Sequence, residues 1–308
     1  MVIASGTIYV VRWNTTGGSV YALSAGNGHI LWQKQTAPIF GVAPGQNNGL
    51  LYVATSNFSN SHPIGAISAL RASDGSQMWN VKMEQSLTGN LVVTANALYT
   101  AIIPPSNPSA STTVLALQLS NGTTLWKQSV AGSTPYPNGL EASNQAAFVV
   151  TTVNASGTVY ALKATNGAQL WHYTNHSSGI VLSPQNANGA VYVAAFNGSS
   201  CAVRASDGKQ LWCYQNSKNL FPVGAAYGDI YAGAYQSPSH SFCALRASNA
   251  TRLWCSPVDS FAPIEAGTQD TVYAATTKNN LDAFHNSNGK LLWHKMMNGS
   301  IFGLGIAE

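Results

Sequence analysis

Apolar and polar residues alternate in short runs along almost the whole chain. The clearest runs read LLYVATS, ALYTAII, AAFVVTT, AVYVAAF, DIYAGAY and TVYAATT. Alternation with a period of two is typical of β-strands that bury one face. No segment keeps a helical period, so the pattern predicts an all-β protein.

A second pattern follows each run: an alanine, a polar turn that is usually Asn-Gly or Asp-Gly, and a tryptophan mostly preceded by leucine. It occurs seven times, at intervals of 39 to 47 residues. A period of this size built from strand-like segments is typical of a radial array of small sheets. Trp13 falls outside the register. The tryptophans of the repeat, which we interpret as packing residues, are Trp32, Trp79, Trp126, Trp171, Trp212, Trp254 and Trp293.

Each copy predicts a β-hairpin. Ala22 and Trp32 are ten residues apart, as are their equivalents in the other copies. A three-residue loop would place the two directly opposite each other, with the turn glycine in the left-handed region. The sixth copy has Asn249-Ala250 in place of the glycine pair. We expect that turn to be strained or differently built.

A further short apolar segment follows each tryptophan and predicts an inner strand. Four strands per repeat give 28 in all and predict a seven-bladed β-propeller of four-stranded antiparallel blades. We assign residues 1–308 to one domain with seven repeats. The ring is expected to close by pairing of the N- and C-terminal strands, since both MVIAS and IFGLGIAE match an inner strand. Which terminal strand fills that place, an eight-bladed parent and a longer precursor all stay open.

Composition narrows the function classes. Only 8% of the residues are charged, against about 25% in a typical soluble protein, so Asn, Ser, Thr and Gln must cover the surface. The net charge of +4 is scattered, and no basic patch supports nucleic-acid binding. We expect no membrane span, and a leader peptide that was removed or left out of this sequence stays open because the chain opens almost inside a strand.

The four cysteines occupy matching places in two neighbouring hairpins. Cys201 lies opposite Cys213, and Cys243 opposite Cys255, by the same pairing count as the alanines and tryptophans. Opposed residues of an antiparallel pair can lie within disulfide reach, so we predict these two disulfides. Reduced thiols and a bond between Cys213 and Cys243 are the alternatives. Disulfides would indicate an extracytoplasmic setting: secreted, on the cell surface or periplasmic.

Eight Asn-x-Ser/Thr sequons are candidate glycosylation sites, although a chain rich in these residues also produces them by chance. They lie at Asn14, Asn57, Asn121, Asn154, Asn175, Asn197, Asn249 and Asn298.

The repeat A-L-x-A-x-(Asp/Asn)-Gly-x-x-L-W resembles that of the PQQ-like (quinoprotein alcohol dehydrogenase-like) β-propeller superfamily over essentially the whole chain. The resemblance favours the non-catalytic branch, which includes the outer-membrane assembly lipoprotein and uncharacterised bacterial extracellular proteins. Catalytic members carry an adjacent cysteine pair and a calcium-binding acid and amide set, but no Cys-Cys occurs here. Glu141, Glu265 and Glu308 fall on predicted inner strands and offer a weak calcium set. No histidines show metal spacing, and we interpret His172 and His294 as exposed polar residues.

The loops between second and third strands vary in length, which is where binding usually resides on a rigid scaffold. Aromatic residues recur where the inner strands begin, with Leu87 and Ile180 at the matching places of two blades. These aromatics either contact a ligand at a channel mouth or pack between blades. They are Phe40, Tyr136, Phe221, Phe261 and Phe302.

The sequence thus favours a non-enzymatic extracytoplasmic binding or scaffold propeller. Its partner would be a protein, peptide or glycan, and no cofactor or metal is expected. A PQQ-dependent oxidoreductase, which would use PQQ with calcium, is the runner-up. A surface structural or filament subunit is the third interpretation.

Overall fold

The structure of the chain is a computed structural model, and it divides into two compact units, Met1–His172 and Tyr173–Ile306. The prediction of a single domain is not tested by this division and stays a prediction. The residues that the structure describes are 2–4, 7–14, 17–24, 27, 29–46, 48–57, 64–83, 87, 91–102, 111–133, 139–153, 156–175, 185–194, 199–215, 220–226, 228–234, 240–259, 264–267, 270–276, 278 and 280–296.

The first unit contains three complete sheets and most of a fourth, whose last strand crosses the boundary between the units. The first sheet is formed by β1 (Val2–Ala4), β2 (Thr7–Asn14), β3 (Gly17–Ser24) and β4 (Ile30–Thr36). The second is formed by β5 (Ile39–Pro44), β6 (Leu50–Asn57), β7 (Ile64–Arg71) and β8 (Gln77–Met83). The third is formed by β9 (Val92–Val93), β10 (Leu98–Ile102), β11 (Ser111–Leu117) and β12 (Thr124–Ala131). The fourth is formed by β13 (Leu140–Ala142), β14 (Ala146–Val153), β15 (Ser156–Lys163) and β16 (Gln169–Asn175).

The second unit contains the last three sheets. The fifth is formed by β17 (Gln185–Ala187), β18 (Ala190–Ala194), β19 (Ser199–Arg204) and β20 (Gln210–Gln215). The sixth is formed by β21 (Leu220–Ala226), β22 (Asp229–Ala234), β23 (His240–Arg246) and β24 (Arg252–Val258). The seventh is formed by β25 (Ile264–Gly267), β26 (Thr271–Ala275), β27 (Asn280–His285) and β28 (Leu291–Met296).

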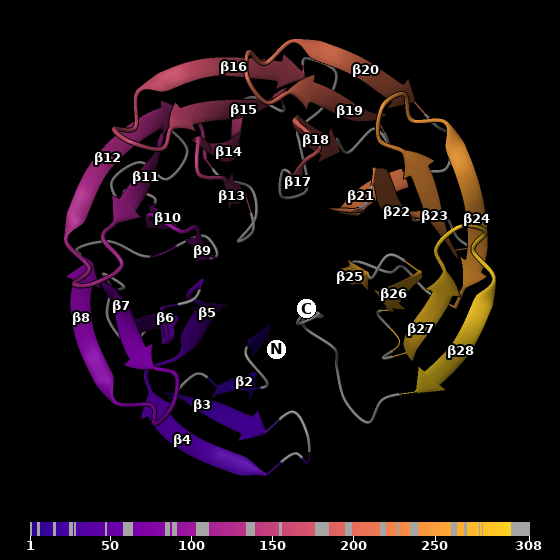
Figure 1. The fold of residues 1–308 in the computed structure, drawn as a ribbon. Helices are drawn as coiled ribbons and strands as arrows, with labels where there is room; N and C mark the ends of the chain where they lie inside the picture. Colours follow the sequence, from indigo (N-terminus) through magenta and orange to yellow (C-terminus); the bar gives the residue numbers. More distant parts are fainter. Residues whose placement is uncertain are drawn as a thin grey trace. The chain divides into compact units, whose positions relative to one another are not determined.

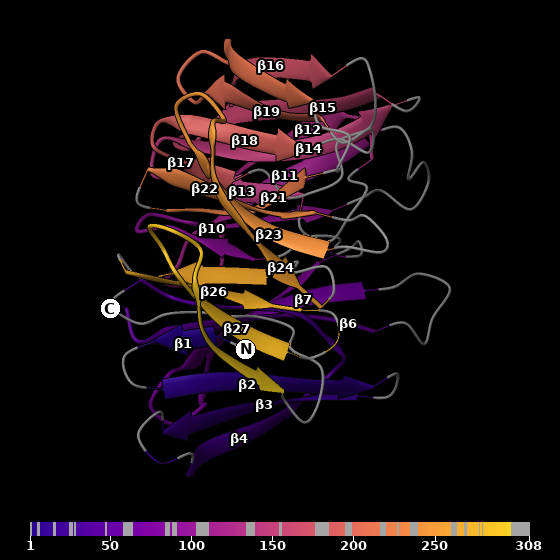
Figure 2. The ribbon, with the colours of Figure 1, turned by 90° about the vertical axis from the view of Figure 1, so that its right-hand side faces the viewer.

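The fold is the predicted all-β, seven-bladed propeller of four-stranded antiparallel sheets. Each sheet takes four consecutive strands in chain order (Figure 1), and β2, β3 and β4 lie side by side in the first of them (Figure 2). β1 pairs with β2, so the first sheet is complete within the N-terminal residues. Residues 297–308 lie outside the described residues, and pairing of the two termini therefore stays a prediction.

The hairpins confirm that alanine lies opposite tryptophan but correct the predicted loop. Ala69 pairs with Trp79, while Leu70 pairs with Gln77, so the register shifts at Met78. The Arg71 N–H donates to the Ser76 carbonyl at 2.8 Å, which leaves a loop of four residues. The expected three-residue loop was wrong. A four-residue loop with a one-residue bulge and a three-residue loop without one both place alanine and tryptophan ten residues apart and opposite each other.

The bulge has a second consequence, because its extra residue is the leucine or methionine that precedes tryptophan. In the six hairpins whose register is described, this residue has no partner in the cross-strand register. All six are exposed, by 37% to 54% of their surface. The motif's Leu-Trp step therefore places an apolar residue on the surface. The six residues are Leu31, Met78, Leu125, Leu211, Leu253 and Leu292.

Tryptophan joins each sheet to the next one in its unit, as the packing interpretation predicts. Trp32 Nε1 donates to the Ala72 carbonyl at 2.8 Å, and an ideal Cβ on Gly75 would lie 2.7 Å from Trp32 Cε3. Gly75 has a φ of +70°, the left-handed conformation expected of it. The same indole-to-carbonyl bond joins Trp79 to Leu119, Trp126 to Ala164, Trp212 to Ala247 and Trp254 to Asn286.

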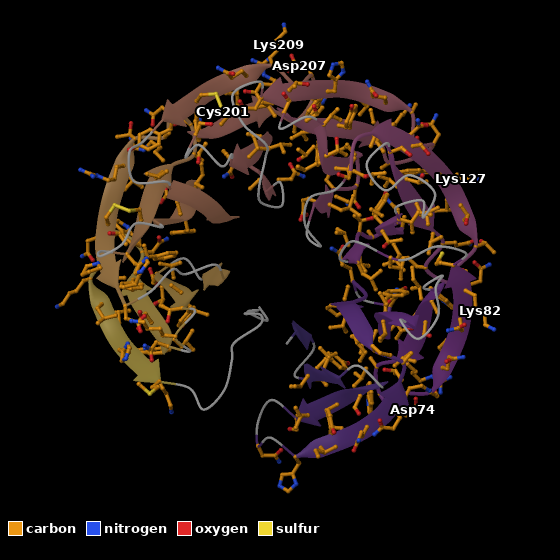
Figure 3. All side chains as sticks on the ribbon, turned by 180° about the vertical axis from the view of Figure 1, so that it is seen from behind. Asp74, Lys82, Lys127, Cys201, Asp207 and Lys209 are labelled. Carbon is orange, nitrogen blue, oxygen red and sulfur yellow. A yellow bond between two sulfur atoms is a disulfide. The ribbon has the colours of Figure 1, made fainter. Side chains whose placement is uncertain are left out.

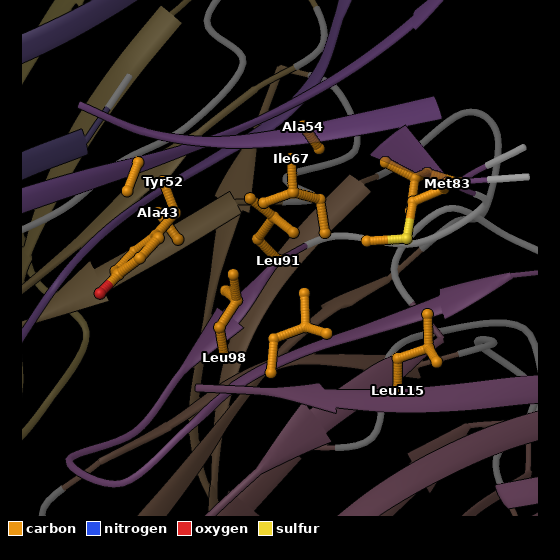
Figure 4. Packing of buried hydrophobic residues seen from close by; sticks show 11 residues of the cluster. Ala43, Tyr52, Ala54, Ile67, Met83, Leu91, Leu98 and Leu115 are labelled. Atoms are coloured by element: carbon orange, nitrogen blue, oxygen red, sulfur yellow. The ribbon is translucent and has the colours of Figure 1, made fainter. Parts of the chain in front are cut away.

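The core lies between neighbouring sheets, as expected for a propeller. Tyr52 and Ile67 of the second sheet pack with Leu98 and Leu115 of the third in one buried cluster (Figure 4). Trp293 departs from the pattern, since 43% of it is exposed whereas Trp32, Trp126, Trp171 and Trp254 are 7% to 8% exposed. Its sheet is the last of the second unit, and no described strand of that unit follows it.

The sixth hairpin keeps the common turn without the common glycine. Ala250 has a φ of +57°, and its N–H donates to the Arg246 carbonyl at 2.9 Å, as Gly75 N–H does to Arg71. Left-handed backbone costs a residue with a Cβ about 1–2 kcal/mol. The expected strain is therefore present, and the turn is not differently built.

Candidate functional site

The two ends of each sheet differ in their connections. We call the end with the second-to-third strand connections the loop edge, and the end with the third-to-fourth strand turns the turn edge. The strand bounds place the longest second-to-third strand connections at 58–63, 103–110 and 235–239, whereas those at 15–16 and 154–155 are minimal. The variable connections predicted from sequence therefore lie at the loop edge. Because strands within a sheet are antiparallel, the inner strands also begin there.

The third-to-fourth strand turns are uniform, and two of them pair an arginine with an aspartate. Arg204 Nη1 lies 2.9 Å from Asp207 Oδ2. The Lys209 backbone N–H donates to Asp207 and, as the largest cause, holds the pKa of that carboxyl below its usual range. Asp207 and Lys209 are labelled at one such turn, and Asp74 at another (Figure 3). The aspartates of these turns therefore serve the local fold.

The predicted aromatic set is only partly described. Phe40 lies on β5 and Phe221 on β21, which are inner strands of different units, but their side chains lie outside the described part. Phe40 lies at a register shift and has no partner on β6, whereas Phe221 pairs with Gly233 on β22. Leu87, at the matching place of the third sheet, is buried in the core against Leu91 and Ile102. Outside the described residues lie Tyr136, Ile180, Phe261 and Phe302.

Two of the three inner-strand carboxylates can be placed. Glu141 lies on β13 opposite Phe148, and burial, as the largest cause, raises the pKa of its carboxyl to about 7. Glu265 lies on β25 opposite Ala274, and Glu308 is outside the described residues. Glu141 and Glu265 belong to separate units. Within the described ranges, no three His, Cys, Asp or Glu side chains are grouped to hold a metal ion.

A polar cluster that the sequence did not reveal lies toward the loop edge of the last sheet. Asp282 is buried, and its Oδ1 lies 2.5 Å from His294 Nδ1. Asn280, two residues earlier on β27, is also buried and its Nδ2 donates to Asp259 Oδ2. His294 is exposed, as the sequence predicts, but it is also paired with a buried carboxylate, which the sequence did not indicate. His172 is exposed as expected, and its ring is tilted against that of Tyr160 with the ring centroids 5.9 Å apart.

The cysteines form the two predicted disulfides. Cys201 is bonded to Cys213 and Cys243 to Cys255, with Cα atoms 4.1 Å apart in each pair. In the last sheet, Asp282 and His294 occupy the same cross-strand place. This register position therefore joins the third and fourth strands in each of the last three sheets.

The sequons differ in accessibility. Asn121 and Asn249 are exposed in turn-edge loops, where glycosylation is sterically allowed. Asn175 is buried at the end of β16 and donates to Ser199 Oγ at 3.3 Å, so its side chain is not accessible for glycosylation in the folded chain. Asn14 and Asn57 end β2 and β6. Asn154, Asn197 and Asn298 lie outside the described residues.

A protein-family model described as outer membrane protein assembly factor BamB matches residues 1–147 and 110–297. The chain belongs to this family. No curated protein sequence matches it significantly. No helix among the described residues is long and apolar enough to cross a membrane.

Three solved structures share the fold. BamB from Moraxella catarrhalis is 15% identical with a TM-score of 0.66, and the alignment covers 98% of this chain and 93% of that one. The computationally designed Ika8 protein is 11% identical with a TM-score of 0.76, over 100% and 90% of the two chains. Quinohemoprotein alcohol dehydrogenase ADHIIG from Pseudomonas putida HK5 is 13% identical with a TM-score of 0.68, over 99% and 66%. At these identities the likeness concerns the fold alone.

Proposed function

We propose that this BamB-family propeller is a non-enzymatic extracytoplasmic scaffold that binds a protein partner through the loop edges of its sheets. The observation that carries the proposal is the contrast between the two edges. The third-to-fourth strand turns are uniform and satisfied by their own hydrogen bonds, whereas the second-to-third strand connections vary in length from 15–16 to 103–110. Variation confined to one edge of a rigid scaffold is typical of a binding surface. A peptide or glycan would be recognised at the same edge.

Loop exchange tests this proposal. We would replace residues 103–110 by a two-residue connection like 154–155, and residues 58–63 in the same way. The controls are Lys82→Ala and Lys127→Ala on the outer strands β8 and β12 (Figure 3). Envelope proteins captured by the immobilised wild type should be lost with the shortened loops and kept with both controls. Equal capture by all four variants would contradict binding at the loop edge.

The inner-strand aromatics test the finer form of the proposal. We expect Phe40→Ala and Phe221→Ala to weaken capture while costing little stability, whereas Leu87→Ala, at a buried matching place, should cost about 2–5 kcal/mol. Denaturant unfolding separates the two roles. A loss as large as that of Leu87→Ala in both variants would show that the phenylalanines pack between sheets, and would remove them from the binding surface.

The competing activity is a PQQ-dependent oxidoreductase. ADHIIG shares the fold at 13% identity. The adjacent cysteines of such enzymes have no counterpart in this chain, because all four of its cysteines form the two hairpin disulfides. The residues present therefore do not match that cofactor site. Dye reduction with added PQQ, calcium and an alcohol or sugar is the direct assay. Turnover above that of denatured protein would overturn the scaffold proposal.

The proposed location follows from the same disulfides. Cross-linked cysteines persist in oxidising compartments, and the reducing cytosol keeps most thiols free. Both pairs are closed, and no cysteine among the described residues is free. Fractionation of the native source should find the protein in the periplasm, on the cell surface or in the medium. Recovery in the cytosol with four reduced thiols would contradict this.

A second candidate function, a surface filament subunit, is favoured by the exposed bulge residues. Leu31, Leu125 and Leu211 each place an apolar side chain on the outer strand of a sheet. Exposed apolar side chains beside an outer strand edge favour contact between copies. Sedimentation of the purified chain decides: self-association abolished by Leu125→Ser would support the filament, whereas a monomer at high concentration would exclude it.

A further inference from the structure

His294 is held by a buried carboxylate while about half of its own side chain stays in solvent. Its Nδ1 lies 2.5 Å from Asp282 Oδ1, and 47% of the His294 side chain is exposed, against 6% of the Asp282 side chain. A carboxylate only accepts hydrogen bonds, so Nδ1 carries the proton and donates it to this bond. In the neutral ring the lone pair is therefore on Nε2, and the bond to Asp282 fixes its direction.

This bond is more than cross-strand pairing requires at its position. Asp282 stands directly opposite His294 across β27 and β28. At the matching place of the second sheet, neutral side chains make the cross-strand bond, because Asn80 Nδ2 donates to Ser68 Oγ at 2.7 Å. A buried carboxylate costs free energy that such a neutral pair avoids. A carboxylate that orients an exposed imidazole is instead typical of a histidine that binds a metal ion.

A methionine lies beside this imidazole on the same strand. Met296 is two residues beyond His294 on β28, so both side chains leave the same face of the strand. Met296 is 71% exposed, more than any other large apolar residue of the described chain. Packing therefore does not explain a methionine at this place, since so exposed a side chain buries little apolar surface. Its thioether sulfur is a soft metal ligand, and imidazole is a ligand that copper also takes.

We propose that His294 and Met296 form a binding site for Cu(I), with Asp282 as the residue that positions the imidazole. Thioether sulfur selects Cu(I), whereas Zn²⁺ and Ca²⁺ prefer nitrogen, thiolate or oxygen ligands. No thiolate competes for the ion, because no cysteine among the described residues is free. Cu(I) accepts few ligands, so a pair of side chains on one strand holds it with the remaining place open to solvent. The site lies on the outer strand β28 and does not depend on a partner bound by the variable loops.

The test uses the full chain, with Ag⁺ and Cu(I) as the probes. Ag⁺ shares the ligand preference of Cu(I) and needs no reductant, which would open the disulfides. NMR titration of the folded chain with Ag⁺ should shift the ring signals of His294 and the methyl signal of Met296 together. Anaerobic competition with a chromophoric Cu(I) chelator then measures the affinity. Zn²⁺ at the same concentration should leave the Met296 methyl signal in place, because a thioether is not a zinc ligand.

Matched variants identify the two ligands. Met296→Leu removes the sulfur and keeps an apolar side chain, so Ag⁺ and Cu(I) affinity should fall by about tenfold or more, no less than for loss of a residue that only orients a ligand. Met78→Leu, at another exposed methionine, should leave binding unchanged. His294→Ala should abolish binding. His172→Ala is its control, since His172 is also exposed and also follows a tryptophan.

Asp282→Asn tests the positioning role. The amide keeps the shape of the side chain but loses the charge, so affinity should fall about 10–100-fold. Nitrogen chemical shifts of the His294 ring should show a mixture of tautomers in the variant and one tautomer in the wild type, a change that a purely structural role would not produce. Melting without metal shows whether each variant folds. Equal Ag⁺ affinity in wild type and Met296→Leu, or Ag⁺ shifts no larger at His294 and Met296 than at His172 and Met78, would overturn the proposal.

Discussion

Gly75 lies against the indole of Trp32, forty-three positions earlier in the sequence. An ideal Cβ on Gly75 would stand 2.7 Å from Trp32 Cε3, and the Trp32 Nε1 donates to the carbonyl of Ala72 in the same turn. The glycine of one hairpin is thus required both by its own left-handed backbone and by the tryptophan of the preceding sheet.

This double requirement predicts a large effect of Gly75→Ala. We expect a loss of about 2–4 kcal/mol in the free energy of unfolding, from left-handed strain and from a clash that displaces Trp32. Gly49→Ala is the matched control, since Gly49 has a φ of +65° but no atom within 4 Å of the added Cβ. It should cost only about 1 kcal/mol. Equal losses would show that the indole contact contributes nothing.

Ala250 provides the reverse experiment. Its φ of +57° lies in the left-handed region that glycine adopts at the same place in other described turns. Ala250→Gly should raise the free energy of unfolding by about 0.5–1 kcal/mol, because relief of backbone strain outweighs the loss of a buried methyl group. Gly208→Ala, at the same place in the fifth sheet, should destabilise the protein. A loss of stability in Ala250→Gly would mean that the methyl packs productively and the strain is small.

Glu141 predicts a pH dependence of stability. Its folded pKa is about 7, above the usual value of 4.5, so the native state holds a proton that the unfolded chain has released. The free energy of unfolding should therefore fall as the pH rises from about 4.5 to about 7. By pH 8 the cost should reach about 3 kcal/mol.

Glu141→Gln removes this titration while keeping the shape of the side chain. Denaturant unfolding of the two proteins at pH 4.5 and pH 8 should show the variant close to wild type at the lower pH and more stable at the higher one. A constant difference between the two proteins across that range would mean that Glu141 is ionised normally in the folded chain.

The disulfides predict a specific chemical and energetic pattern. No cysteine should react with a thiol reagent in denaturant until a reductant is added, and peptide mapping should link Cys201 to Cys213. The double variant Cys201→Ala/Cys213→Ala should lose about 3 kcal/mol, because each bond closes a short loop of separation 12.

A control for this loss exists at the same register position of the second sheet. There Asn80 Nδ2 donates to Ser68 Oγ at 2.7 Å, and both residues lie on the surface side of the hairpin. Replacing both with alanine should cost about 0.5–1.5 kcal/mol. If the cysteine double variant lost no more free energy of unfolding than the Ser68/Asn80 double variant, the disulfide would add nothing beyond a hydrogen bond at this position.

Several features were within reach of the sequence because they depend on neighbours along one hairpin. The alternation of apolar residues located the strands, and the constant Ala22 to Trp32 spacing correctly placed these residues opposite each other. The same count paired Cys201 with Cys213. The spacing did not reveal the four-residue loop, since a three-residue loop and a longer loop with a bulge give an identical count.

The sequence by itself determined the sheets and which residues face each other across neighbouring strands. The tertiary structure decided which side chains are buried between one sheet and the next. That Trp254 donates to Asn286 depends on one sheet lying against the next. The burial of Asp282 beside His294 and the raised pKa of Glu141 have the same origin. The desolvation of a side chain depends on residues distant in the sequence, whereas pairing in a hairpin depends on residues a few positions away.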